Sequence, residues 1–247
     1  MKGRDFLKAN WNLLEGFRSD QSKGMKNPPV QKPVKDGAEK VSLPDPEDFT
    51  PGQTDIRNVI DARRSIRNFP NEPLTMEELS WLLWTTQGIQ KVLGDGKATL
   101  RTVPSGGARH PFETYLMVFN VTGLEPGIYR YLPLDHSLEV LDRAADKDGM
   151  IRGCHGQTFC GESCVTFVWS VIPYRTEWRY GPVSHKVIAL DAGHLCQNLY
   201  LACTAAELGT CAIGAYDQNA MDDLMGFDGM DEYTIYIAPV GRKSPLE

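Results

Sequence analysis

The sequence has no excess of positive charge. Its 247 residues include 26 Lys and Arg against 32 Asp and Glu, which gives a formal net charge of −6. Because a general nucleic-acid-binding surface is normally basic, we expect no nucleic-acid partner.

Long apolar runs are absent as well. No stretch reaches the roughly 18 apolar residues that a transmembrane helix needs, so we expect no membrane partner. The N-terminal stretch MKGRDFLKANWNLLEGF carries charges where a signal peptide would have an uncharged apolar core. We therefore expect a cytoplasmic protein.

Metal-ligand spacing is also missing. The six cysteines all fall in the C-terminal half, and no two are separated by the two residues typical of zinc sites. Cys154, His155, Cys160 and Cys164 have metal-ligand composition without metal-ligand spacing. We expect no metal, and free thiols instead of disulfides.

Prolines concentrate in the N-terminal part. Six of the 16 prolines lie between Pro28 and Pro51, and each one removes a backbone donor and restricts the residue before it. Residues 1–53 are therefore expected to form a proline-rich arm, with one short amphipathic helix over residues 5–17. Such an arm must lie on its own domain or on a second subunit, and we expect the second.

Residues 54–247 mix helical and strand patterns without strict βαβ order, which favours an α+β domain. Helices are predicted from Thr54 to Arg64, from the Thr75–Glu78 capping box to Gly88, and over 184–208 and 218–225. Strands are predicted over 113–119, 127–131, 137–141, 165–172, 211–215 and 233–239. The glycine-rich segment 89–111 is expected to be a long loop.

The densest positive cluster consists of Arg63, Arg64, Ser65 and Arg67. Guanidinium groups and a hydroxyl this close in sequence can bind a phosphate through charge-assisted hydrogen bonds. A solvated basic helix end that complements the helix dipole would have the same sequence. The cluster alone does not decide between these two interpretations.

Three glycine-containing segments are suited to contact with a ligand. Paired glycines let the backbone lie against a flat molecule, and small residues leave backbone N–H groups accessible. The residues are Pro104, Ser105, Gly106 and Gly107, then Ala212, Ile213 and Gly214, then Gly241 and Arg242. An ordinary turn, a helix stop before a strand, and a solvated tail are the respective alternatives.

In this order the segments resemble the nitroreductase family of FMN-dependent oxidoreductases, and most closely its SagB-type dehydrogenase branch. The residues that carry the resemblance are RRSIR at 63–67, PSGGARHP at 104–111, GIYRY at 127–131, YRTEWRYG at 174–181, LDAGHLCQNLYLACTAAELGT at 190–210 and PVGRK at 239–243. The resemblance implies a nitroreductase-like α+β fold, with helices flanking a central, mostly antiparallel sheet. It also implies an intertwined homodimer that binds FMN at the subunit interface through residues 54–247.

The resemblance implies a role for each segment. Arg63 and Ser65, with Arg242 from the other end of the chain, would contact the FMN phosphate, and Arg67 would reach the N1/O2 edge of the flavin. Residues 104–107 would come from the partner subunit and lie against the isoalloxazine ring. The backbone of residues 212–214 would face flavin N5. The nearly double negative charge of the FMN phosphate explains such arginines in a chain of net charge −6.

The same resemblance leads to a hypothesis about function. NADH or NADPH would reduce the FMN, and the flavin would pass electrons to a nitroaromatic, quinone or similar flat small-molecule acceptor in a ping-pong cycle. Because the flavin carries the redox chemistry, we assign no catalytic side chain. Two alternatives stay open: a SagB-like FMN dehydrogenase that oxidises a peptide or small molecule, and a flavin-binding protein without turnover.

One pair departs from the SagB pattern. Azoline-oxidising members of that branch have a Lys-Tyr pair after the apolar strand, where this chain has Arg179 and Tyr180. Arginine is almost never neutral, so it is a poor proton acceptor. We therefore expect no formation of thiazoles or oxazoles from peptides. Arg179 and Tyr180 remain substrate-side candidates, and a structural role for Arg179 is the alternative.

Overall fold

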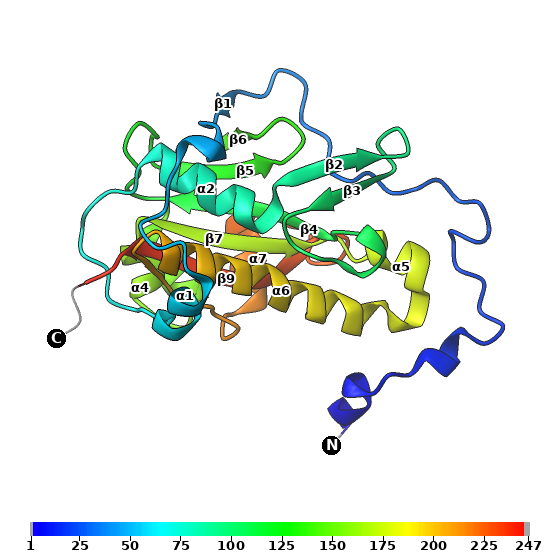
Figure 1. Cartoon of the computed structure of the whole chain (residues 1–247). Coiled ribbons are helices and arrows are strands. Elements are labelled where there is room, and N and C mark those ends of the chain that lie inside the picture. The colour runs from blue at the N-terminus through cyan, green and yellow to red at the C-terminus, as the bar shows by residue number, and fades with distance from the viewer. Residues whose placement is uncertain (1, 245–247) are drawn as a thin grey trace.

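Seven antiparallel strands form the centre of the computed structural model, which describes residues 2–244 (Figure 1). The order across the sheet is β1-β6-β5-β4-β7-β9-β8, and every neighbouring pair is antiparallel. The strands are β1 (Lys40–Ser42), β4 (Phe112–Val118), β5 (Gly127–Leu132), β6 (Ser137–Asp142), β7 (Val165–Val171), β8 (Leu208–Thr210) and β9 (Tyr233–Arg242). All residues of β4 and β7 are buried, as expected for central strands covered on both faces.

Helices cover both faces of this sheet. They are α1 (Ile56–Ala62), α2 (Met76–Gln87), α3 (Lys147–Gly153), α4 (Phe159–Glu162), α5 (Tyr174–Tyr180), α6 (Ser184–Ala205) and α7 (Gln218–Met225). Buried side chains of α2 and α6 share one hydrophobic core with the sheet, and those of α3, α4 and α7 share a second one. Figure 1 shows the long helix α6 lying across the sheet beside α2. The predicted α+β fold with an antiparallel sheet between helices is confirmed.

Two helix starts show how local sequence determines the elements. The predicted capping box is present, because the Thr75 side chain accepts from the Glu78 N–H and the Glu78 side chain accepts from the Thr75 N–H. The cap of α1 is Asp55 instead of the predicted Thr54, since the Asp55 carboxylate accepts from the Arg57 N–H at 2.8 Å.

The prediction of a loop over 89–111 is wrong for its first part. Strands β2 (Ile89–Leu93) and β3 (Ala98–Arg101) form a hairpin. Its turn places Gly94, Asp95 and Gly96 at positive φ, which glycine and aspartate tolerate. The predicted strand 211–215 is also wrong, because β8 ends at Thr210 and further along only Ile213 bridges to β9.

Much of the N-terminal arm packs along its own domain, and the expectation that it lies on a second subunit stays a prediction. The predicted helix over 5–17 is instead two short 3₁₀ helices, η1 (Lys2–Leu7) and η2 (Trp11–Leu14). Further along, the Gln21 N–H donates to the Trp178 carbonyl at 2.9 Å, and β1 pairs with β6 at the sheet edge. In an extended, proline-rich backbone the carbonyl groups are free to accept hydrogen bonds. Residues of the domain donate hydrogen bonds to them.

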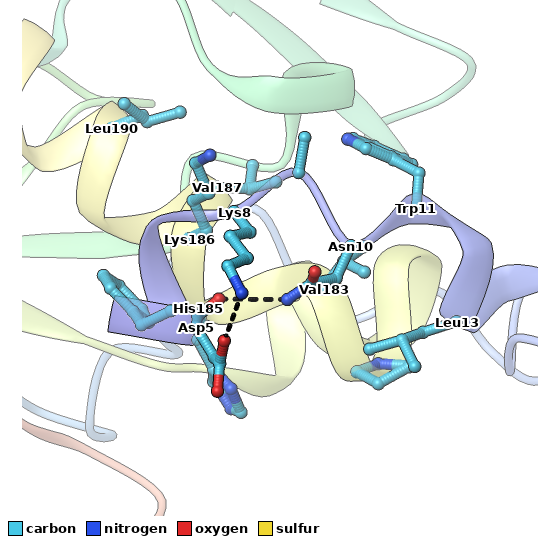
Figure 2. A pocket seen from close by; sticks show the side chains of 13 residues that line it. Asp5, Lys8, Asn10, Trp11, Leu13, Val183, His185, Lys186, Val187 and Leu190 are labelled. Carbon is cyan, nitrogen blue, oxygen red and sulfur yellow. Dashed lines mark hydrogen bonds and ion pairs between the residues drawn. The ribbon is translucent and has the colours of Figure 1, made fainter. Parts of the chain in front are cut away.

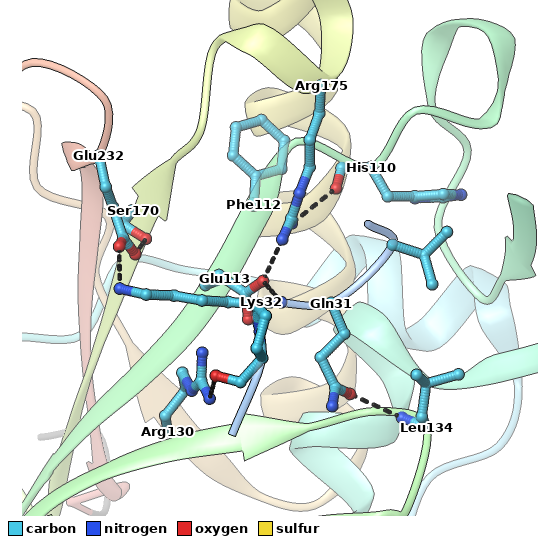
Figure 3. Close-up of polar contacts among 12 residues, drawn as sticks. Gln31, Lys32, His110, Phe112, Glu113, Arg130, Leu134, Ser170, Arg175 and Glu232 are labelled. Atoms are coloured by element: carbon cyan, nitrogen blue, oxygen red, sulfur yellow. Dashed lines mark hydrogen bonds and ion pairs between the residues drawn. The ribbon is translucent and has the colours of Figure 1, made fainter. Parts of the chain in front are cut away.

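Residues 30–35 of the arm cover a charged part of the sheet. Arg101 and Arg130 donate to the carbonyls of Val30 and Pro33 at 2.7 and 2.9 Å. In the opposite sense, the Lys32 N–H donates to the Glu113 carboxylate at 2.6 Å. Figure 3 shows Lys32 lying between Glu113 and Glu232, while Arg175 reaches Glu113 from α5. The arm main chain thus completes the hydrogen bonding of buried charged groups.

Two further features of the described chain concern cysteines and membranes. All six cysteines are buried free thiols. No helix among the described residues is long and apolar enough to cross a bilayer.

Candidate functional site

Tyr200 on α6 joins two segments that the sequence analysis singled out. Its hydroxyl shares a hydrogen bond of 3.0 Å with the Ser65 hydroxyl and accepts from the Ala212 backbone N–H at 2.8 Å. The Arg63 guanidinium carbon lies 5.4 Å from the centroid of the Tyr200 ring. Residues 63–65 and 212 therefore meet at one side chain, although about 150 residues separate them in sequence.

The backbone brings these two segments together. Helix α1 ends where the Arg63 N–H donates to the Val59 carbonyl, and the chain then leaves the helix in an extended conformation. The Ile66 N–H donates to the Thr210 carbonyl at 2.9 Å. Gly209 is needed for this approach, because a Cβ there would lie 2.7 Å from Ile66 Cγ2.

The positive charges at this junction are open to an external anion. Arg63 is half-buried, and Arg64, Ser65 and Arg67 are exposed. Within residues 4–244, none of the three arginines takes part in an ion pair. Arg64 donates to the Asp61 and Arg63 carbonyls at 2.7 and 2.8 Å, so it closes the end of α1. Arg63 and Arg67 remain available.

The three predicted backbone donors at 212–214 differ in availability. The Ala212 N–H donates to Tyr200, and the Ile213 N–H donates to the Ile237 carbonyl at 2.7 Å. Gly214 is exposed, and its N–H has no hydrogen-bond partner in the described chain. A Cβ at Gly214 would meet no atom within 4 Å. The segment thus offers one free N–H, at Gly214, next to the open space.

Arg242 ends β9 and Lys243 follows it, and these two basic residues have different surroundings. Arg242 binds the carboxylate of Glu78, with the shortest contact at 2.5 Å, and donates to the Pro73 carbonyl. Its guanidinium is thus committed to the start of α2. Gly241 lies against Phe69, where a Cβ would come within 2.9 Å.

Lys243 was not among the predicted site residues. It lines a groove of about 490 Å³ together with Ala62 and Thr204, at the end of α1 that carries Arg63. Side chains of neighbouring residues in an extended chain point to opposite faces. In the sequence, this alternation could have indicated that Lys243 and Arg242 have different surroundings.

The predicted turn 104–107 is fixed to the first half of α6. The Ser105 hydroxyl donates to the Asp191 carboxylate at 2.6 Å, and the Gly106 N–H donates to both oxygens of that carboxylate at 3.1 Å. Asp191 is buried, and this burial raises its pKa against the opposing effect of the two hydrogen bonds. One buried carboxylate therefore determines the position of the turn.

The same turn touches the Arg179–Tyr180 pair. Gly107 has a φ of 60°, and a Cβ there would lie 2.6 Å from the Tyr180 hydroxyl and 3.1 Å from Arg179 Nε. Only glycine combines this backbone conformation with such a close approach. The structure thus brings together the glycine segment 104–107 and the substrate-side candidates.

The predicted residues form two clusters along α6. Arg63, Ser65 and residues 212–214 gather near Tyr200, and residues 104–107 with Arg179 and Tyr180 gather near Asp191. Nine residues separate Asp191 from Tyr200, which is about 13.5 Å along a helix axis. No group of three or more His, Cys, Asp or Glu in the described part of the chain could hold a metal ion.

An antiparallel sheet between helices defines an α+β protein, and an open arginine and serine lie at the end of its helix α1. Residues 60–242 match the sequence model of the nitroreductase family. The chain therefore belongs to the nitroreductase family and is an oxidoreductase of that family.

Two relatives show how far the similarity extends. The chain is 32% identical over 205 residues to MJ1384 of Methanocaldococcus jannaschii, a protein assigned as a nitroreductase, covering 83% of this chain and 96% of the relative. It is 26% identical over 142 residues to the trifolitoxin-processing protein TfxB of Rhizobium leguminosarum, covering 54% of this chain and 37% of TfxB. The similarity to TfxB supports the resemblance to the SagB-type branch.

Solved structures share the fold. The crystal structure of a protein assigned as a nitroreductase from Ralstonia eutropha has a TM-score of 0.69 and 28% identity, covering 90% of this chain and all of that one. The NADPH:FMN oxidoreductase of Vibrio harveyi, solved with NAD⁺, has a TM-score of 0.53 and 16% identity, covering 78% and 70%. At 16% identity, the second comparison shows the fold alone.

Proposed function

We propose that the chain is an FMN-dependent oxidoreductase that takes electrons from NADH or NADPH. It passes them to a nitroaromatic, quinone or similar flat acceptor in a ping-pong cycle. The observation that carries this proposal is the junction at Tyr200, where an arginine without an ion pair among residues 4–244, a serine hydroxyl and the 212–214 backbone meet. Family membership and the FMN named for the Vibrio harveyi structure support it.

The residues at the junction fit the phosphate of FMN. Arg63 and Ser65 offer a cation and a hydroxyl, and Lys243 lies at the same end of α1. An arginine that is half-buried without a carboxylate partner is an unusual surface feature unless an anion completes it. Arg242 would have to leave Glu78 to join them.

The flavin end of the site would lie between Arg67 and Gly214. Bound FMN supplies hydride transfer at N5 and electron storage in its ring. The free N–H of Gly214 would donate a hydrogen bond at the N5 edge, and Arg67 would stabilise the negative charge near N1 of the reduced ring. No side chain of this chain then needs to act as general acid or nucleophile.

We also propose that the site is completed by a second copy of the chain. The cluster near Asp191 lies about 13.5 Å along α6 from the cluster near Tyr200, so residues 104–107 of a partner subunit would cover the ring. Ile56 and Ile60 on α1 and Leu190 on α6 are exposed, which leaves apolar surface for such an interface. In this arrangement residues 54–247 form the FMN-binding domain and residues 1–53 its arm, and the dimer acts in the cytoplasm.

A second candidate is supported by the similarity to TfxB. A SagB-like enzyme would oxidise a peptide or small molecule by transferring two electrons to the flavin, and oxygen would then reoxidise the flavin. Slow reduction of the bound flavin by both NADH and NADPH would favour this candidate over the first.

The phosphate assignment is tested by Arg63→Ala. Hydrogen bonds to a charged group contribute about 1.5–3 kcal/mol, so we expect FMN to bind roughly 10- to 100-fold more weakly. The measurement is a titration of apoprotein with FMN followed by flavin fluorescence. Arg57→Ala, which removes an exposed arginine of α1, is the matched control. An unchanged FMN dissociation constant for Arg63→Ala would contradict the assignment.

A further inference from the structure

Two arginines meet at Gly107 on the turn that faces α6. Arg109 Nε donates to the Gly107 carbonyl at 3.1 Å. Arg179 Cδ and Nε lie 3.1 Å from the position that a Cβ of Gly107 would take. The two guanidinium groups come from different elements and are positioned by the same glycine.

No carboxylate compensates this pair in the described part of the chain, because neither arginine takes part in an ion pair there. Asp191 uses its oxygens on Ser105 and Gly106. Glu177 faces His185 at 3.5 Å, and Asp20 binds Lys23 at 3.0 Å. None of these three carboxylates lies within 4.0 Å of the Arg109 or Arg179 guanidinium nitrogens.

The pair is held in place by neutral partners. Arg109 donates to the Asn27 side chain at 2.9 Å, and its guanidinium carbon lies 5.2 Å from the Trp178 ring centroid. The Arg179 guanidinium carbon lies 5.5 Å from the Tyr180 ring centroid. Burial lowers the pKa of Arg109, and the charge of Arg179 lowers it further. Arg109 is half-buried and Arg179 is exposed, so the two neighbouring cations repel each other at the edge of solvent, and a bound anion would relieve this repulsion.

A groove lined mainly by apolar side chains, with Lys8 and Lys186 among its polar ones, is connected to this pair through Trp11 and Tyr180. The Trp11 and Tyr180 rings pack edge to face, with centroids 5.9 Å apart. From Trp11 the groove, of about 390 Å³, continues along α6 past Val187 and Leu190, as Figure 2 shows. A flat molecule whose anionic substituent reaches the arginine pair would lie against the rings of Tyr180 and Trp11.

We propose that Arg109 and Arg179 bind the carboxylate or phosphate of the molecule that reacts at the flavin. Two guanidinium groups offer several N–H donors in fixed planes, which match the oxygens of such groups. The inference rests on the proposed function, because the turn between the arginines is the segment assigned to the flavin ring. It names the substrate class: an acidic aromatic compound or a phosphorylated nicotinamide dinucleotide.

Kinetics with matched substrates test the site in FMN-loaded protein. One pair is 4-nitrobenzoate and 4-nitrobenzamide, and the other is NADPH and NADH. We expect kcat/KM to favour the charged member of one pair at least tenfold. Arg179→Gln and Arg109→Gln should reduce this ratio at least tenfold, and Arg179→Lys should restore part of it. Arg152→Gln, an exposed arginine on α3, should keep the wild-type ratio.

The pair that responds identifies the source of the anion. A ratio that changes only for the nitro compounds indicates a carboxylate on the acceptor, and one that changes only for the dinucleotides indicates the NADPH phosphate. Ratios near one for both pairs, or equal ratios in wild type and in the Arg179 and Arg109 variants, would overturn the inference.

Equilibrium binding separates this inference from the proposed function. Calorimetric titration with 4-nitrobenzoate and 4-nitrobenzamide, and with NADPH and NADH, needs no turnover. If the protein favours a charged ligand at least tenfold through Arg179 but binds no FMN, the function fails and the anion site stands. If FMN binds and is reduced but no charged ligand is favoured, the anion site fails and the function stands.

Discussion

At the scale of single residues, Tyr200 has the most specific position in the site. Its hydroxyl is the link between the Ser65 hydroxyl and the Ala212 N–H. Sequence patterns did not identify it, because a tyrosine on a largely apolar helix resembles a core residue. Arg63 and Ser65 were found because basic and hydroxyl residues cluster there within three positions.

We predict that Tyr200→Phe weakens FMN binding several-fold and lowers the free energy of unfolding by about 1 kcal/mol. The variant removes two hydrogen bonds and leaves the Ala212 N–H without a partner. FMN titration and urea unfolding measure the two effects. Tyr129→Phe on β5 is the control, because it also removes two hydrogen bonds, one to the Glu125 carbonyl and one from Arg143. Equal FMN affinity in wild type and Tyr200→Phe would contradict the role given to Tyr200.

His110 gives a pH-dependent prediction. It is buried at the end of the turn, where burial first and the charge of Arg101 second lower its pKa to about 3 from an ordinary 6.5. The native state thus holds a neutral imidazole, while the unfolded state takes up a proton as the pH falls through 6.5. This stability is fully present above pH 6.5 and is lost on acidification toward pH 3.

We therefore predict that the wild type loses about 1 kcal/mol more stability between pH 7 and pH 5.5 than His110→Asn does. Asparagine tolerates the φ of 43° at this position. Urea unfolding at both pH values measures the difference. The same pH dependence in both proteins would show that His110 does not titrate as described.

At the scale of elements, the clearest prediction concerns how the N-terminal arm contributes to the stability of the fold. The side chains of Arg130 and Glu139 are 3% and 2% exposed, and the arm segment 30–35 supplies hydrogen bonds to both. The arm residues before Gln21 leave several large apolar side chains exposed, among them Leu7 and Trp11. The two parts of the arm should therefore differ in their contribution to stability.

Deletion of residues 1–18 should change the unfolding midpoint only slightly. Deletion of residues 1–36 should lower the free energy of unfolding by several kcal/mol, because each buried charge that loses a hydrogen bond costs about 1–3 kcal/mol. Thermal and urea unfolding of the two truncated proteins test this comparison. Equal stability of both truncations would contradict the account of the arm.

Local sequence patterns predicted the elements that have local signals, such as caps and apolar repeats. They failed for elements whose conformation depends on contacts with other parts of the chain. The capping box at Thr75 and the periodic pattern of α6 were sufficient to predict α2 and α6. Hairpin β2–β3 was missed because glycine and polar residues in its turn dominate the pattern of 89–111. Helix α5 was missed because its residues carry no helical apolar repeat, and it packs through Arg175 on Glu113.

The same distinction holds for the candidate site. Its segments were predicted from their residue types, but the pairing of Arg242 with Glu78 joins positions 164 residues apart. Likewise, the turn 104–107 is held by a hydrogen bond from Ser105 to Asp191, which lies on α6 and 86 residues further along the chain. Contacts of this range depend on the assembled fold, and no local pattern contains them.

At the scale of the whole molecule, the chain is an oxidoreductase of the nitroreductase family, and we propose that its site is built from two clusters along one helix. The cluster near Tyr200 would hold the FMN phosphate, and the cluster near Asp191 would serve the ring and its substrate in a second copy. The exposed apolar residues of α1 and α6 are consistent with such a dimer. The proposed function of both clusters requires that the protein binds FMN and that NADH or NADPH reduces it.

The most direct test is an absorbance spectrum of the purified protein, supplied with FMN, before and after anaerobic addition of NADH or NADPH. The account predicts a flavin band that stays with the protein through gel filtration and is bleached quickly by at least one of the two nucleotides. A protein that retains no flavin band after incubation with FMN would contradict the proposal that this chain is an FMN-dependent oxidoreductase.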